Sequence, residues 1–86
     1  MALQKATVNL KNGLQARAAA SFVQQANRYA ADVFIEMKNC KVSAKSIMGI
    51  MSLALGMGSE IAISAVGPDA DEAVNNLKSI VEKEAV

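Results

Sequence analysis

The feature that most constrains the fold is a repeated change in the spacing of apolar residues along the 86-residue chain. Between residues 3 and 10, Ala6, Val8 and Leu10 alternate with polar residues, and this period of two predicts a half-buried strand. From residue 16 to about residue 28, apolar residues recur three and four positions apart, which predicts an amphipathic helix facing a core. The stripe of this helix consists of Ala19, Phe22, Val23, Ala26 and Ala30.

Strand signals return in the middle of the chain. Residues 32–37 are rich in β-branched and aromatic side chains and predict a second strand. Residues 60–66 predict a further strand, with Ile61, Ile63 and Ala65 on one face. Lys38-Asn39 favours a tight turn, because Asn tolerates a positive φ, and a short strand at 41–43 follows it. The sequence therefore predicts four strands, two of them joined as a hairpin.

Two more helices are predicted from local signals. Ser46 precedes a short helical segment that runs from Ile47 to about residue 53. The last helix follows Gly67-Pro68, with Asp69 as its N-cap and Glu72 three residues later, an arrangement similar to a capping box. Its apolar positions are Ala70, Ala73, Val74, Leu77, Ile80 and Val81.

The predicted order is thus β-α-β-β-α-β-α, without a repeat or a linker. This order indicates an antiparallel four-stranded sheet with three helices on one face, an open-faced two-layer α+β sandwich. Residues 1–86 are expected to form a single domain. Because the chain has two Phe, one Tyr and no Trp, its core must be mainly aliphatic, and Phe22 and Phe34 are expected inside it.

Charge and composition exclude several classes of function. A net charge of +1 gives no global field for nucleic acid or an anionic membrane, and a basic, aromatic sheet face for RNA is not evident. Glycines and Glu60 interrupt the apolar segment 47–63, so this segment is not expected to span a membrane. Residues 1–10 lack the pattern of a signal peptide. A cytoplasmic protein without a metal or cofactor is expected. Cys40 cannot form an intrachain disulfide, and a small core residue or an exposed thiol fits it equally well.

Residues 13–20 predict a tight turn followed by the start of a helix, where free backbone N–H groups can bind an anion. Arg17 lies in the first turn, either as an ordinary solvated helix residue or as a ligand for a phosphate or carboxylate. The chain contains no histidine, and Gln15 is a poor nucleophile because its amide nitrogen lone pair is delocalised. A phosphoryl relay through this segment is therefore not expected.

The segment 45–53 combines a hydroxyl at a helix start with apolar neighbours. From the pattern alone, Ser46 is more often only a helix cap than a modified residue. Helical spacing places Ile47, Met48 and Met51 on one face, with Ile50 and Leu53 toward another. A helix this short cannot bury every side, so one apolar face is expected to be exposed as an adaptable docking surface.

These two segments resemble those of the HPr family of bacterial phosphocarrier proteins. The family has Gly-(Leu/Ile)-His-Ala-Arg-Pro-Ala where this chain has residues 13–19, so Gln15 stands at the place of the phosphorylated histidine and Ala18 at that of the proline. A glutamine there is typical of the catabolite-repression paralogues of HPr. The segment Lys-Ser-Ile-Met-Gly-Ile-Met-Ser-Leu matches the family's regulatory phosphorylation site, with Ser46 as acceptor. The resemblance also implies the strand order 1-4-2-3.

The resemblance further implies a regulatory binding protein rather than an enzyme. HPr kinase/phosphorylase would phosphorylate Ser46, and the phosphorylated chain would act as corepressor of a LacI-type transcription regulator, CcpA, in carbon catabolite repression. A phosphate at a helix start is stabilised rather than disruptive, so it would act by presenting charge to the partner. The implied partner-binding residues are Gln15, Ala16, Arg17, Ala20, Ile47, Met48 and Met51.

The alternative function is that of a phosphocarrier in the phosphoenolpyruvate-dependent sugar phosphotransferase system, which the absent histidine disfavours. The oligomeric state stays open, because an N-terminal edge strand can pair or exchange between copies and form a homodimer.

Overall fold

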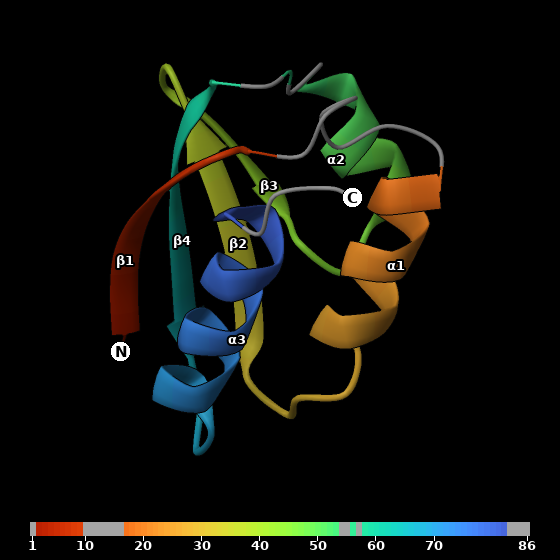
Figure 1. Ribbon diagram of the computed structural model, residues 1–86. Coiled ribbons are helices and arrows are strands. Elements are labelled where there is room, and N and C mark those ends of the chain that lie inside the picture. Colours follow the sequence, from red (N-terminus) through yellow and green to blue (C-terminus); the bar gives the residue numbers. More distant parts are fainter. Residues whose placement is uncertain (1, 10–16, 54–55, 57, 83–86) are drawn as a thin grey trace.

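The computed structural model describes residues 2–9, 17–53, 56 and 58–82, with the backbone alone at Arg17. The elements follow the predicted order β-α-β-β-α-β-α, and the strand predictions at 32–37 and 60–66 are confirmed to the residue (Figure 1). Their bounds are β1 Ala2–Thr7, α1 Arg17–Ala26, β2 Asp32–Met37, β3 Cys40–Ser43, α2 Ile47–Ser52, β4 Glu60–Val66 and α3 Ala70–Glu82. The predicted turn at 11–13 lies outside the described residues.

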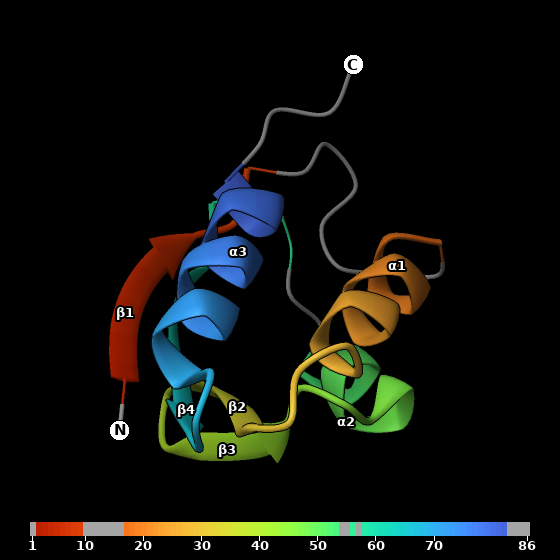
Figure 2. The same ribbon diagram turned by 90° about the horizontal axis from the view of Figure 1, so that it is seen from below.

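The four strands form one antiparallel sheet in the order β1-β4-β2-β3, which confirms the expected topology. α3 packs against β1 and β4, α1 lies beside α3, and α2 contacts α1 and β3. Figure 2 shows α1 and α3 on one side of the sheet, with α2 next to α1. None of the described helices covers the opposite face of the sheet, as expected for a two-layer sandwich.

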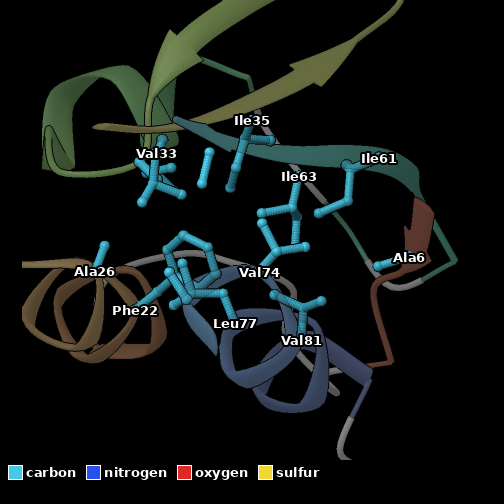
Figure 3. Close-up of a cluster of buried hydrophobic side chains, with 14 of the residues drawn as sticks. Ala6, Phe22, Ala26, Val33, Ile35, Ile61, Ile63, Val74, Leu77 and Val81 are labelled. Carbon is cyan, nitrogen blue, oxygen red and sulfur yellow. The ribbon is translucent and has the colours of Figure 1, made fainter. Parts of the chain in front are cut away.

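The core is aliphatic, as the composition predicts. Phe22 from α1 and Leu77 from α3 point toward Ile35 and Ile63 of the sheet, and all four are fully buried (Figure 3). The alternation along β4 places Ile61, Ile63 and Ala65 on the core face, and the apolar positions predicted for α3 are buried or half-buried. The packing of this face holds α1 and α3 against the sheet.

Two core predictions are wrong. Phe34 is half-buried on the open face of β2, with the Lys41 ammonium 4.8 Å from its ring centroid. Its neighbours Val33 and Ile35 take the core face, so the period of two sends Phe34 outward. Ala30 is exposed, because α1 ends at Ala26 and the chain turns before that residue.

The β2–β3 hairpin has the predicted turn. Lys38 and Asn39 have φ values of 49° and 68°, and two consecutive positive φ angles are those of the type I′ turn that matches strand twist. β3 starts at Cys40 rather than at residue 41, and Cys40 is an exposed free thiol. The exposed alternative for Cys40 is therefore the correct one.

Asp69 stands at the predicted start of α3, where its carbonyl accepts from the Ala73 N–H at 2.9 Å. Its carboxylate, however, accepts the N–H groups of Ala30 and Ala31, both at 2.9 Å, instead of capping the first turn of α3. The capping-box interpretation is thus wrong, because the carboxylate binds the two N–H donors that the α1–β2 connection presents. Asp69 ties that connection to the start of α3.

The pKa of Asp69 is lowered, first by the Ala30 N–H bond, with further contributions from Ala31 and Lys45, against a smaller opposing effect of burial. A carboxyl whose pKa is depressed in the folded state contributes stability above its unfolded pKa, and loses it as the pH falls through the folded value.

We therefore expect Asp69→Asn to lower the midpoint of urea unfolding at pH 7, and the gap from the unchanged protein to narrow as the pH falls below the ordinary value of 3.8. Asp71→Asn, an exposed change in the first turn of α3, is the matched control. Equal losses in the two variants, or a gap independent of pH, would contradict the role given to Asp69.

Candidate functional site

Ser46 lies on a turn that hydrogen bonds hold on several sides. The Ser46 N–H donates to the Ser43 carbonyl at 3.2 Å, and the Lys45 N–H donates to Ser43 Oγ at the same distance. Ala44, fully buried between them, donates its N–H to the Val33 carbonyl of β2 at 2.8 Å. The end of β3 and the start of α2 are thereby fixed to the sheet, and Ser46 has a defined position.

Ser46 is the N-cap of α2, as predicted. Its backbone is extended, with φ −110° and ψ 114°, and its Oγ accepts the Gly49 N–H at 3.2 Å. Its carbonyl accepts the Ile50 N–H at 3.0 Å and begins the helix. The cap uses one lone pair of Oγ, so the hydroxyl proton and a second lone pair of this exposed residue stay available to another molecule.

Lys45 makes a contact that the sequence analysis missed. Its Nζ donates to the Tyr29 carbonyl at 2.9 Å, just beyond the end of α1. The bond links residues 16 positions apart. No local pattern predicts such a contact, because it depends on how α1 and β3 are brought together. It ties the turn before Ser46 to the segment that Asp69 also holds.

The two faces of α2 differ as expected. Met48 is 76% exposed, and Met51 and Ile47 are 47% and 39% exposed, whereas Ile50 and Leu53 are buried. Ile47, Met48 and Met51 therefore form an exposed apolar surface, called here the α2 surface, that begins immediately after Ser46. Exposed methionines can adapt their shape to a partner.

The residues predicted on the first helix are described only in part. Ala20 is half-buried on α1, which packs beside α2. Arg17 begins α1, but its side chain lies outside the described residues, as do Gln15 and Ala16 entirely. The structure therefore brings α2, which has Ser46 as its N-cap and carries the α2 surface, next to α1, the helix that carries Ala20 (Figure 1).

Other candidate sites carry less chemistry. An open depression of about 560 Å³ lies at the ends of β1, β2 and β4, and its charged lining of Lys5, Lys38, Glu36, Glu60 and Glu82 mixes both signs. It contains none of the predicted site residues. Within the described residues, no group of three His, Cys, Asp or Glu side chains is placed to hold a metal ion. Within the same part of the chain, no helix has the length and apolarity needed to cross a membrane.

Comparisons with known proteins find a family match and similar sequences. Residues 3–83 match the family description "PTS HPr component phosphorylation site". The sequence is 54% identical over 84 residues to the HPr-like protein Crh of Bacillus subtilis (strain 168), covering 98% of this chain and 99% of that protein.

Several solved structures are similar to this one, including the following two. The crystal structure of the phosphocarrier protein HPr from Bacillus anthracis has a TM-score of 0.91 and 57% identity, covering 93% of this chain and 95% of that one. A crystal structure of Bacillus subtilis Crh, described as a dimer with a swapped domain, has a TM-score of 0.79 and 52% identity, covering 100% and 99%.

The fold and the sequence match define a small phosphocarrier or regulatory protein rather than an enzyme. The chain belongs to the HPr family. Within that family it is similar to the HPr-like regulatory proteins named Crh.

Proposed function

We propose that this chain is phosphorylated on Ser46 by HPr kinase/phosphorylase and then acts as corepressor of the LacI-type regulator CcpA in carbon catabolite repression. One observation carries the proposal: an exposed hydroxyl on a fixed turn adjoins an exposed apolar surface. One partner would then contact both a charged group on Ser46 and the apolar side chains of Ile47, Met48 and Met51. Similarity to proteins named Crh supports the same function.

The modification is a phosphoryl transfer from a nucleoside triphosphate. A bond forms between Ser46 Oγ and the terminal phosphorus, and the bond to the nucleoside diphosphate leaving group breaks. The hydroxyl proton passes to a base of the kinase. Ser46 fits the acceptor role because the residue is exposed and the turn before it is held by hydrogen bonds of Ser43 and Lys45.

Gln15 separates this function from that of a phosphocarrier. A phosphocarrier needs a nitrogen nucleophile that forms a labile bond, and no histidine exists in the 86 residues. The rival function, a component of the sugar phosphotransferase system, is supported by the family match and by the similar Bacillus anthracis HPr. Incubation with phosphoenolpyruvate and Enzyme I tests it, since an acid-labile, alkali-stable phosphorylated form would favour the rival.

The partner-binding surface is proposed to combine the α2 surface with the start of α1. Phosphoserine 46 would pair with basic groups of the regulator and Arg17 with acidic ones, because a guanidinium suits bidentate pairing with carboxylates. The remaining proposed contacts are Gln15, Ala16 and Ala20. Binding to a transcription regulator places the proposed function in the cytoplasm, without direct contact to nucleic acid or a membrane.

Besides the complex with the regulator, we propose that this chain forms a homodimer. β1 is an edge strand that pairs only with β4 among the described strands, and edge strands can pair or exchange between copies. The Crh structure described with a swapped domain supports this proposal.

The direct test is phosphorylation by purified HPr kinase/phosphorylase with ATP and Mg²⁺, followed by intact-mass measurement. The unchanged chain is expected to gain one phosphoryl group and Ser46→Ala none. Ser52→Ala is the matched control, because Ser52 is exposed on the same helix and its Oγ donates to the Gly49 carbonyl. Modification of Ser46→Ala at an unchanged rate would refute the assignment.

A further inference from the structure

Gly49 occupies the third position of α2, where glycine is a poor choice for a helix. Its conformation does not require glycine, since the glycines with positive φ among the described residues are Gly58 and Gly67. Almost any residue could adopt the backbone of Gly49, and alanine would favour the helix. A glycine that disfavours the helix next to a candidate site indicates a role other than helix formation.

The surroundings of Gly49 show what a side chain would meet there. A Cβ added to Gly49 would lie 3.5 Å from both Cβ and Oγ of Ser46. On its other side it would lie 3.2 Å from Val42 Cβ of β3. A Cβ at position 49 would therefore be in contact with both β3 and the Ser46 side chain.

We propose that Gly49 is a specificity-determining residue for the phosphorylation of Ser46, because its missing side chain leaves the hydroxyl open to the phosphoryl donor. The inference rests on the proposed function, in which Ser46 is the acceptor. Phosphoryl transfer requires the attacking oxygen, the phosphorus and the leaving oxygen to lie roughly in line. One side of Oγ is already occupied by the Gly49 N–H at 3.2 Å, so a side chain at 49 would narrow the approach that is left.

The backbone role of residue 49 is unaffected by substitution. Its N–H donates to Ser46 Oγ and its carbonyl accepts from Ser52 Oγ at 2.7 Å, and every residue except proline retains both groups. Substitution therefore changes what stands beside the hydroxyl while it keeps the N-cap. Ile47, Met48 and Met51 are unchanged in such a variant, so the α2 surface is retained.

A packing role for Gly49 is the competing explanation. The 3.2 Å contact to Val42 Cβ is tight, and glycine could serve only to let α2 approach β3. The two explanations differ in what they predict. Crowding against Val42 lowers the thermal midpoint and leaves the folded protein a good substrate. Obstruction of Ser46 lowers phosphorylation of the folded protein and increases with the size of the side chain.

The experiment compares Gly49→Ala and Gly49→Gln with the unchanged chain, using purified HPr kinase/phosphorylase, ATP and Mg²⁺. Phosphorylation rates and thermal midpoints are measured on the same samples, at a temperature where circular dichroism shows each variant folded. Gly56→Ala is the matched control, because an added Cβ there meets nothing within 4 Å and its φ is ordinary.

We expect kcat/KM for phosphorylation to fall about tenfold or more in Gly49→Gln and less in Gly49→Ala, mainly through kcat, with Gly56→Ala unchanged. Equal kcat/KM in Gly49→Gln and the unchanged chain would overturn the inference. A decrease in kcat/KM that is fully explained by a lowered thermal midpoint would also overturn it. Failure of the unchanged chain to be phosphorylated would instead overturn the proposed function itself.

Discussion

Replacing Gly67 with alanine is expected to lower the free energy of unfolding by about 2–5 kcal/mol. Gly67 has a φ of 151°, a region that residues with a side chain rarely adopt. A Cβ there would lie 2.6 Å from Ala31 Cα and 2.8 Å from Ala31 Cβ. These atoms cannot rotate away, because Ala31 is buried and its N–H is bound by Asp69. The turn before α3 and the α1–β2 connection would have to separate.

Urea unfolding checks this expectation, with Gly56→Ala as the matched control for a glycine in open space. The urea midpoint of Gly67→Ala should fall with little change in the slope of the free energy against urea, since the variant and the unchanged protein expose similar surface on unfolding. Gly56→Ala should stay within about 0.5 kcal/mol of the unchanged protein. A Gly67→Ala variant as stable as that control would show that the two segments can move apart at little cost.

The elements of this fold follow from local sequence signals to a large degree. The apolar residues of β4 and α3 repeat at spacings that only one kind of element satisfies, and both segments are as predicted. Ser46 and the α2 surface could also be predicted, because a six-residue helix has too few residues to hide two apolar faces. Short-range chemistry therefore explains most of the candidate phosphorylation site.

The contacts of Asp69 and Lys45 were not predicted because their partners lie across the fold, and Phe34 was misplaced because of its position within its own strand. Asp69 was expected to cap its own helix, but tertiary packing brings the N–H groups of Ala30 and Ala31 to its carboxylate. Phe34 was expected in the core because it is aromatic, whereas its place in the alternation of β2 decides its face. The contact of Lys45 with Tyr29 is a third case, since these residues meet only when α1 and β3 are assembled.

The closeness of Gly49 to Val42 also depends on assembly, because it is set by how α2 rests on β3. The sequence shows a glycine in a helix but not what its missing side chain leaves open. Gln15, on which the distinction from a phosphocarrier depends, lies outside the described residues, and its meaning comes from residue type alone. The role proposed for Gly49 thus depends on a tertiary contact, whereas the role given to Gln15 depends only on the chemistry of its side chain.

The second large effect is expected at the regulator. Phosphorylation of Ser46 should raise the affinity for CcpA by about 10–150-fold, since one charge-assisted hydrogen bond contributes roughly 1.5–3 kcal/mol. Met48→Gln should weaken binding of the phosphorylated chain, because Met48 is the most exposed residue of the α2 surface. Leu3→Gln is the matched control, since Leu3 is an exposed apolar residue on β1, away from α2.

A calorimetric titration of CcpA with phosphorylated and unphosphorylated chain tests the switch at Ser46 most directly. The phosphorylated chain is predicted to bind tightly, and the unphosphorylated chain and kinase-treated Ser46→Ala are predicted to bind equally weakly. Equal affinity of the phosphorylated and unphosphorylated chains would contradict a regulatory role for Ser46.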